Sequence, residues 1–206
     1  MIPFNVILFD DFETLDVFGP VEIIGKMPKI YDLGYYSMNG GNALSSHQVS
    51  VNTKPFIDID TSGILLIPGG MGTRSLVNDI DFIDYIKVLS QEALYVLTVC
   101  TGSALLAKTG LLNGRNATSN KLAFNWVCEN GTDINWIKKA RWVSDGKYYT
   151  SSGVSAGMDM TLGFISDIHG EKTALDISNL IEYIWNKDKD DDPFANSCFI
   201  GYMEVI

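Results

Sequence analysis

A cysteine lies where a predicted strand gives way to a predicted helix. Residues 95–99 (YVLTV) are typical of a buried strand, Cys100 follows directly, and residues 102–109 (GSALLAKT) have helical character. The free N–H groups and the dipole of a helix start favour negative charge, so we expect a lowered thiol pKa at Cys100. The N–H of Thr101 could also bind an anion formed on a substrate. The alternative is an inert buried cysteine, but location and residue type together favour a nucleophile.

A glycine pair ends a second predicted strand. Residues 63–68 (GILLIP) stop at Gly69 and Gly70, and glycine lets backbone N–H groups face inward at a strand end. In the functional interpretation the Gly70 N–H supplies half of an oxyanion hole, and Gly69 belongs to the same substrate-binding turn. In the structural interpretation the pair only makes a turn that needs positive φ. The two interpretations are compatible.

A carboxyl group is expected beside the cysteine. Asp16 stands just before an apolar, helix-like segment, where it could be a simple N-cap. Its neighbours Leu15, Val17 and Phe18 could instead raise its pKa, so that a protonated Asp16 donates to the thiolate and later shuttles a proton. Charge alone does not choose between Asp16 and the other acids nearby, which are Asp10, Asp11, Glu13 and Glu22.

A rival serine motif occurs later in the chain. Residues 153–157 (GVSAG) match the pattern G-x-S-x-G of a serine nucleophile elbow. That enzyme class needs a histidine from a separate loop, but His169 stands at the far end of the same predicted helix, roughly 20 Å from Ser155 at a 1.5 Å rise per residue. We therefore interpret this segment as a close-packed turn near the cysteine, with Gly153 and Val154 among the substrate- or anion-binding residues.

The predicted elements alternate between strand and helix. The buried strands are residues 5–9, 63–68 and 95–99, and helical patterns cover residues 81–93, 102–109, 121–128, 156–168 and 171–185. This alternation predicts a single α/β domain over residues 1–206, with a flavodoxin-like, doubly wound, mostly parallel sheet sandwiched by helices. Ligands of such folds bind beyond the carboxyl ends of the strands, where Asp16, Gly69 and Cys100 would converge.

Three smaller features complete the expected fold. Residues 40–42 (GGN) predict a turn between short strands at residues 31–38 and 48–52. Asp145 and Gly146 predict a hairpin between residues 142–144 and 147–150. Residues 187–192 (KDKDDD) indicate a solvated helix end.

Composition excludes several classes of protein. A formal net charge of -10 disfavours nucleic acid as a partner, and no apolar run approaches the ~20 residues of a membrane span. The odd count of three cysteines (Cys100, Cys128 and Cys198) and the absence of a visible secretory signal favour a reducing cytoplasm. Two histidines make a histidine-rich metal site unlikely, and nothing in the sequence calls for a cofactor.

Short motifs run in order along nearly the whole chain. They are residues 7–12, 15–22, 68–70, 99–103, 117–119, 145–146 and 152–159. On these residues the chain resembles the ThiJ/PfpI superfamily, within the class I glutamine amidotransferase-like fold. Within this superfamily the chain is most similar to isocyanide (isonitrile) hydratases. Two features carry this resemblance: Asp16 in the Leu-Asp-x-x-Gly-Pro segment, and Thr101 directly after the cysteine.

Departures from the family narrow the expected activity. Protease and amidase relatives usually carry histidine directly after the cysteine, where this chain has Thr101, so the resemblance disfavours a peptidase. Hydratase relatives commonly have histidine where this chain has Asn120, which puts the substrate in question. Regulators of the family carry an additional helix-turn-helix domain, which this sequence is expected to lack. Relatives are commonly homodimers, and the apolar face of residues 171–185 could pair subunits.

The resemblance implies that the Cys100 thiolate attacks an isocyanide carbon, that Asp16 serves as proton donor, and that water then releases an N-substituted formamide. A redox-responsive or protective protein with an oxidisable cysteine is the main alternative, and a small-molecule amidase or glyoxalase-like enzyme is a weaker one. Four aromatic residues could line the pocket or simply pack in the core. They are Phe12, Tyr36, Phe124 and Trp126.

Overall fold

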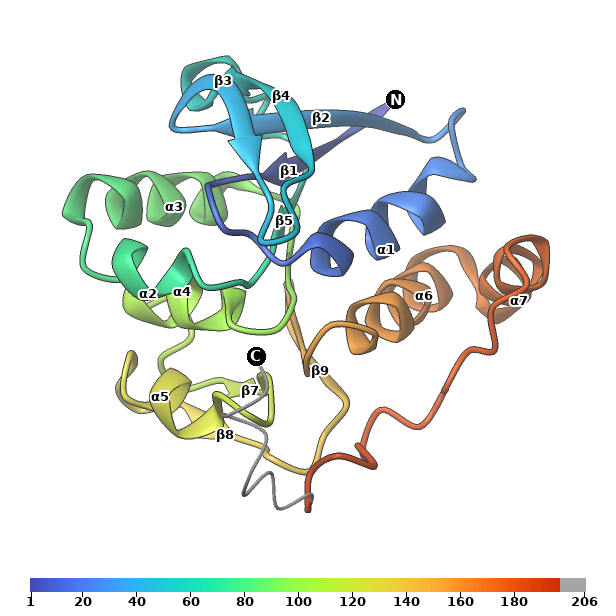
Figure 1. Cartoon of the computed structure of the whole chain (residues 1–206). Coiled ribbons are helices and arrows are strands. Elements are labelled where there is room, and N and C mark those ends of the chain that lie inside the picture. The colour runs from blue at the N-terminus through green and yellow to red at the C-terminus, as the bar shows by residue number, and fades with distance from the viewer. Residues whose placement is uncertain (197–206) are drawn as a thin grey trace.

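A central sheet of eight strands organises the chain. In the computed structural model, which describes residues 1–196, the strands follow the order β3-β4-β2-β1-β5-β6-β10-β9 (Figure 1). The strands are β1 (Ile2–Ile7), β2 (Tyr31–Ser37), β3 (Asn39–Leu44), β4 (Ser50–Pro55), β5 (Ile64–Ile67), β6 (Tyr95–Thr98), β9 (Trp142–Asp145) and β10 (Tyr148–Ser151). All neighbours pair in parallel except β3 with β4 and β9 with β10 at the two edges.

Helices cover both faces of this sheet. Figure 1 shows α1, α6 and α7 on one face and α2, α3 and α4 on the other. The helices are α1 (Thr14–Gly25), α2 (Thr73–Leu76), α3 (Ile80–Glu92), α4 (Gly102–Lys108), α5 (Phe124–Cys128), α6 (Ala156–His169) and α7 (Glu171–Leu180), with a 3-10 turn η1 (Phe56–Asp58). A two-stranded sheet of β7 (Asn116–Ala117) and β8 (Asn135–Trp136) lies beside α5. The predicted doubly wound α/β sandwich is confirmed.

The central strands are buried on both sides, as their apolar sequences predict. All four residues of β5 are buried, and so are Val96 and Leu97 in β6, because helices cover both faces of a parallel sheet. Because β1, β5 and β6 run parallel to one another, their carboxyl ends lie at the same edge of the sheet. That edge holds the segments that carry Asp16, Gly69 and Cys100.

The predicted turn at residues 40–42 is wrong. These residues lie inside β3, and Gly40 and Gly41 take φ values of 72° and 88° while the strand pairs with β4 in antiparallel register. Glycine allows such a conformation within an edge strand, where it locally kinks the ladder. The actual reversal follows β3, where the Ser45 N–H donates to the Val49 carbonyl (2.9 Å).

The prediction of a solvated helix end at residues 187–192 is wrong for the helix and for Asp192, whereas residues 187–191 are exposed as predicted. Helix α7 ends at Leu180, and residues 187–192 are not helical. Asp192 is 3% exposed and lies 3.6 Å from Arg141 and 3.7 Å from Lys121, whereas a solvated helix end would leave it in water. Arg141 also pairs with the buried Asp159 at 2.6 Å. The partners lie on distant loops, which a local charge pattern does not reveal.

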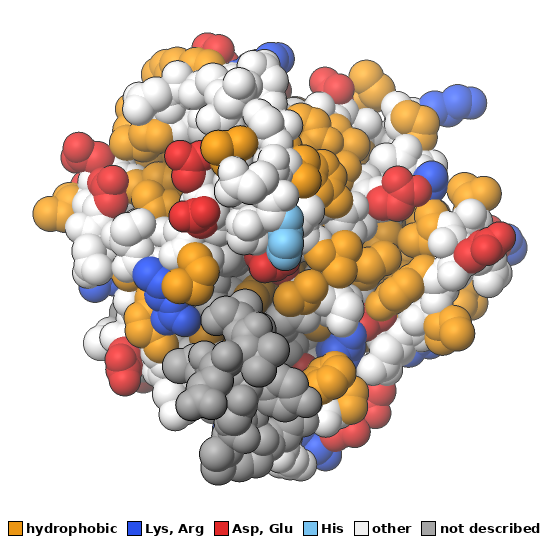
Figure 2. All heavy atoms as spheres, viewed as in Figure 1, with side chains coloured by type: hydrophobic (Ala, Val, Ile, Leu, Met, Phe, Trp, Pro, Cys, Tyr) orange, Lys and Arg blue, Asp and Glu red, His pale blue; other side chains and the backbone are white. Residues whose placement is uncertain are grey.

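Apolar side chains remain on the outside of the helices. Figure 2 shows such side chains over α1 and α6, and Leu180 and Ile184 are 67% and 92% exposed. This surface is compatible with the expected homodimer, which stays a prediction. Among residues 1–196 no helix combines the length and the apolar character needed to cross a bilayer.

Candidate active site

Cys100 occupies a strained turn between β6 and α4. Its φ is 57°, a left-handed conformation that a residue with a side chain adopts only when its surroundings enforce it. Its N–H donates to the Ser152 carbonyl (3.2 Å), and its own carbonyl accepts from the hydroxyls of Ser119 (2.8 Å) and Ser103 (3.0 Å). Hydrogen bonds on both sides of the residue therefore hold the side chain in one direction.

Asp16 lies in the first turn of α1 with its side chain turned into the protein. Glu13 holds the N-cap position, so the interpretation of Asp16 as a simple N-cap is wrong. The side chain is fully buried, and its Oδ2 accepts from the Gly69 N–H at 2.9 Å. Its Oδ1 is also buried, and no described residue lies in hydrogen-bonding geometry with it. One carboxylate oxygen is thus fixed by the backbone, and the other remains available for proton exchange.

Burial sets the proton affinity of both groups. It raises the pKa of Asp16 from 3.8 to about 8, against opposing contributions from the Gly69 and Val154 N–H groups and from the Cys100 thiol. Burial, together with the negative charge of an ionised Asp16, raises the pKa of Cys100 well above its ordinary range. The N–H groups of Thr101 and Val154 oppose this increase but do not overcome it.

The expected low thiol pKa is therefore wrong for the resting site. Helix α4 has only seven residues, and its N-terminal amides do not offset the loss of water around the sulfur. At neutral pH the resting pair holds its protons. The nucleophile forms in the molecules in which Asp16 is ionised, because only the carboxylate can take the thiol proton as the sulfur attacks.

The amides around the sulfur differ in part from those expected. Gly69 donates to Asp16, and Gly70 donates to the Thr101 hydroxyl (3.1 Å), so both glycine N–H groups already have acceptors. The amides that stabilise charge on the sulfur belong to Thr101 and Val154. Val154 has φ 48°, a genuine outlier for a β-branched residue, and this conformation accompanies the placement of its N–H at the sulfur.

Thr101 and Gly153 position neighbouring segments. The Thr101 hydroxyl accepts from the Thr73 hydroxyl (3.1 Å) as well as from Gly70, which ties the turn after β5 to the turn after β6. A side chain on Gly153 would collide with the Asn120 amide. Asn120, which stands where related hydratases commonly have histidine, accepts from the Ala123 N–H at 2.8 Å and faces the cavity.

The serine motif does not form a catalytic triad. The Ser155 hydroxyl accepts from Arg141 (3.3 Å) at the start of α6, while His169 at the far end of that helix is bonded to Tyr31 (2.6 Å). The other histidine, His47, interacts with the Thr14 hydroxyl (2.8 Å). Neither histidine is bonded to the serine, as the helix length predicted.

A cavity of about 290 Å³ opens at Cys100. It is lined by Glu13, Gly70, Met71, Arg74, Cys100, Thr101, Asn120, Leu122, Ala123 and Val154. A neighbouring hollow shares Asn120, Leu122 and Val154 and reaches Phe194. None of the four aromatic residues considered from the sequence lines the cavity. Of the residues missed, Arg74 had a visible signal, because it stands two residues after Gly72, the last glycine of the glycine-rich turn.

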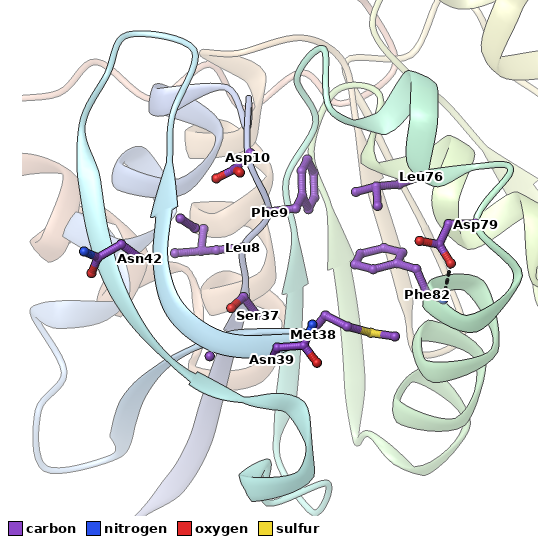
Figure 3. Close-up of a pocket in the computed structure, with 12 residues that line it drawn as sticks. Leu8, Phe9, Asp10, Ser37, Met38, Asn39, Asn42, Leu76, Asp79 and Phe82 are labelled. Atoms are coloured by element: carbon purple, nitrogen blue, oxygen red, sulfur yellow. Dashed lines mark hydrogen bonds between the residues drawn. The ribbon is translucent and has the colours of Figure 1, made fainter.

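A second cavity of about 310 Å³ lies between β3 and helices α2 and α3 (Figure 3). Its two carboxylates already serve the backbone: Asp10 accepts from the Leu44 N–H and Asp79 from the Phe82 N–H, both at 3.0 Å. The lining contains no cysteine or histidine. The groups suited to covalent chemistry are therefore concentrated in the cavity at Cys100.

The chain is similar to known proteins over most of its length. Residues 4–167 match the DJ-1/PfpI family. The chain belongs to the DJ-1/PfpI family. It is 30% identical to an isonitrile hydratase from Pseudomonas putida over 183 residues, which cover 86% of this chain and 76% of the relative. The resemblance found in the sequence motifs is confirmed.

Family members with other functions are also similar. A transcriptional regulator, CdhR from Pseudomonas aeruginosa, is 27% identical across 72% of this chain, but the match covers only 44% of the regulator. Among solved structures, a ThiJ/PfpI family protein from Pseudomonas syringae has a TM-score of 0.80 with 24% identity, over 98% of this chain and 79% of that protein. Drosophila melanogaster DJ-1beta has a TM-score of 0.75 with 17% identity, over 89% and 99% respectively. These two structures confirm the fold.

Adding a methyl group at Gly69 should disturb the pair. A Cβ there would lie 2.6 Å from the Thr101 nitrogen and 2.9 Å from Asp16 Oδ2, both closer than van der Waals contact. We expect Gly69→Ala to destabilise the fold by about 1–3 kcal/mol, as overpacked substitutions do, and to slow Cys100 alkylation by displacing Thr101 and Asp16. Urea unfolding and iodoacetamide kinetics measure the two effects. Wild-type values in both would contradict this account of the turn.

Proposed function

We propose that this protein hydrates a small electrophile through Cys100, and that an isocyanide is the substrate class, converted to an N-substituted formamide. The observation that carries the proposal is the buried pair of Cys100 and Asp16 at the end of a cavity, with one Asp16 oxygen free of hydrogen bonds among the described residues. The similarity to an isonitrile hydratase over most of both chains supports the same reaction class.

In the first step, the sulfur of Cys100 forms a bond to the terminal isocyanide carbon. The thiol proton passes to Asp16 Oδ1 and from there to the same carbon, so that a neutral thioimidate, R–N=CH–S–Cys100, results. The Thr101 and Val154 N–H groups stabilise negative charge on the sulfur as the proton leaves. A carboxyl with a pKa of about 8 suits this transfer, because it both accepts and returns a proton near neutral pH.

In the second step, water adds to the thioimidate carbon. Asp16 takes one proton from the water and passes it to the imine nitrogen, which gives R–NH–CH(OH)–S–Cys100. The carbon–sulfur bond then breaks, the remaining hydroxyl proton goes to the sulfur, and R–NH–CHO leaves. The sum is one isocyanide plus one water giving one formamide, with no oxidant, reductant or further co-reactant.

The test is incubation with an alkyl isocyanide, with the formamide followed by NMR and its oxygen traced with ¹⁸O-labelled water. We expect enzyme-dependent formamide that contains the labelled oxygen. Cys128→Ser is a matched control because Cys128 lies at the end of α5, outside the cavity lining, and it should leave turnover intact. Absence of formamide with a fully reduced Cys100 would contradict the proposal.

A redox role draws less support from the site. Oxidation of cysteine proceeds through the thiolate, and burial raises the pKa of Cys100 rather than lowering it. Selective peroxide oxidation of Cys100 in a protein that fails to hydrate isocyanides would favour this alternative. Methylglyoxal turnover tests the glyoxalase-like one.

A further inference from the structure

Arg74 has an unusual setting in the cavity at Cys100. It is the second residue of α2, two residues after Gly72 of the glycine-rich turn, and it lines the cavity with the nucleophile. Its guanidinium carbon lies 3.5 Å from the centre of the Trp126 ring. Stacking of this kind holds a guanidinium in place through one face and leaves its N–H groups, at the edges, free to bind.

Arg74 also has no counter-charge among the residues that the structure describes. Of the chain's three arginines, Arg115 pairs with Asp145 at 3.0 Å and Arg141 with Asp159 at 2.6 Å. Among residues 1–196, no carboxylate lies within ion-pairing distance of Arg74, and no hydrogen bond from its side chain is formed. A half-buried guanidinium with five unused donors is a ready site for a planar anion.

The other residues of the cavity lining indicate what chemical character the rest of the ligand should have. Met71, Leu122, Ala123 and Val154 give it a mainly apolar wall. The one acidic side chain in the lining, Glu13, faces His47 at 3.8 Å rather than pairing with Arg74. The cavity thus has a nucleophile, an apolar wall and one stacked cation.

We propose that the site selects electrophiles that carry a carboxylate on a short apolar spacer, with Arg74 as the residue that binds this carboxylate. The inference rests on the proposed function for the role of Cys100 as nucleophile. It adds a substrate class, an isocyanide bearing a carboxylate, and a residue that determines specificity. The fork of the guanidinium matches the two oxygens of a carboxylate in bidentate fashion.

The first experiment does not depend on isocyanide turnover. Cys100 is alkylated with iodoacetate and, separately, with iodoacetamide, two reagents of similar size of which only the first carries a carboxylate. Peptide mass spectrometry follows the site, and N-acetylcysteine gives the intrinsic ratio of the two rates. Relative to that reference, we expect wild-type Cys100 to favour iodoacetate about tenfold, the effect of one charge-assisted hydrogen bond.

Variants then assign the preference to one residue. Arg74→Gln should abolish the preference for iodoacetate, and Arg74→Lys should restore only part of it, because an ammonium group lacks the planar fork. Arg115→Gln removes the same charge from outside the cavity lining and should leave the rate ratio at its wild-type value. An unchanged ratio in Arg74→Gln, or an equal fall for both reagents, would overturn the proposal.

The second experiment compares an isocyanide carboxylate with its methyl ester. We expect a kcat/KM ratio of about tenfold in favour of the carboxylate, which Arg74→Gln removes. If neither isocyanide is hydrated, the proposed reaction fails, whereas the alkylation ratio still decides the carboxylate site on its own. If both are hydrated equally well, the carboxylate site is overturned and the proposed reaction stands.

Discussion

Replacing Cys100 with alanine should reduce isocyanide hydration to the uncatalysed rate, a loss of at least about 10⁴-fold, because no other thiol of residues 1–196 lines the cavity. Cys100→Ser should be nearly as inactive, since a serine hydroxyl is a much weaker nucleophile at this pH. The measurement is formamide formation by NMR at matched protein concentration. Persistent activity within about tenfold of wild type would remove the covalent mechanism.

The same variant should fold normally. The Cys100 backbone is held by Ser152, Ser119 and Ser103 through groups that alanine retains. We therefore expect the free energy of unfolding in urea to change by about 1 kcal/mol or less. A larger loss would mean that the inactivity reports misfolding, and Cys100→Ser, which keeps most of the side-chain volume, would then be the decisive variant.

Asp16→Asn should lower kcat/KM about 1,000-fold, within the range that general acid–base groups contribute. The amide retains an oxygen to accept from Gly69, so the turn after β5 should persist, but it neither takes the thiol proton nor delivers it to the isocyanide carbon. In the wild type, kcat/KM should rise as the pH rises through about 8, where Asp16 becomes the carboxylate that accepts this proton. A near-normal rate in Asp16→Asn would remove Asp16 from the mechanism.

The ionisation of Asp16 should also affect the stability of the fold. Its contribution to stability should fall with rising pH, whereas kcat/KM should increase. Because folding raises the pKa of Asp16 from 3.8 to about 8, the folded state binds a proton that the unfolded state releases between these values. The contribution of Asp16 to stability is therefore greatest below its unfolded pKa and falls as the pH rises through this window. Asp16→Asn should flatten this part of the curve of unfolding free energy against pH, which urea titrations measure. An identical slope in both proteins would contradict the raised pKa.

Most of the sheet could be predicted from the sequence because each central strand is a short apolar run with a clear end, at Asp10 after β1, at the glycine-rich turn after β5 and at Cys100 after β6. β5 and β6 are buried on both faces and leave little ambiguity. The edge strand β3 could not be predicted, since its glycines are typical of a turn and its pairing with β4 decides otherwise. The apolar pattern of the sequence is enough to predict an interior strand, whereas an edge strand depends on pairing with its neighbour in the sheet.

The site was predictable in its location and less so in its electrostatics. Strand ends that share one edge of a sheet bring Asp16, Gly69 and Cys100 together, which chain order suggests. The pKa of Cys100 depends on how much water surrounds the sulfur, a property of the whole core rather than of the first turn of α4. The position of Arg74 close to the glycine-rich turn was a visible signal, but its lack of a counter-charge among residues 1–196 depends on where the carboxylates of those residues lie, which the sequence does not show.

The buried contact of Asp192 has a consequence for how the protein is made. Asp192 faces Lys121, whose ammonium donates to the Ser119 carbonyl (3.3 Å), and the Ser119 hydroxyl in turn donates to the Cys100 carbonyl (2.8 Å). During synthesis, the strands of the sheet and the residues Asp16 and Cys100 leave the ribosome before Asp192 does. They therefore lack the contact between Asp192 and Lys121 until Asp192 follows. The nucleophile turn should reach its final rigidity only when residues near 192 have emerged and docked, which happens after all eight strands of the central sheet have been made.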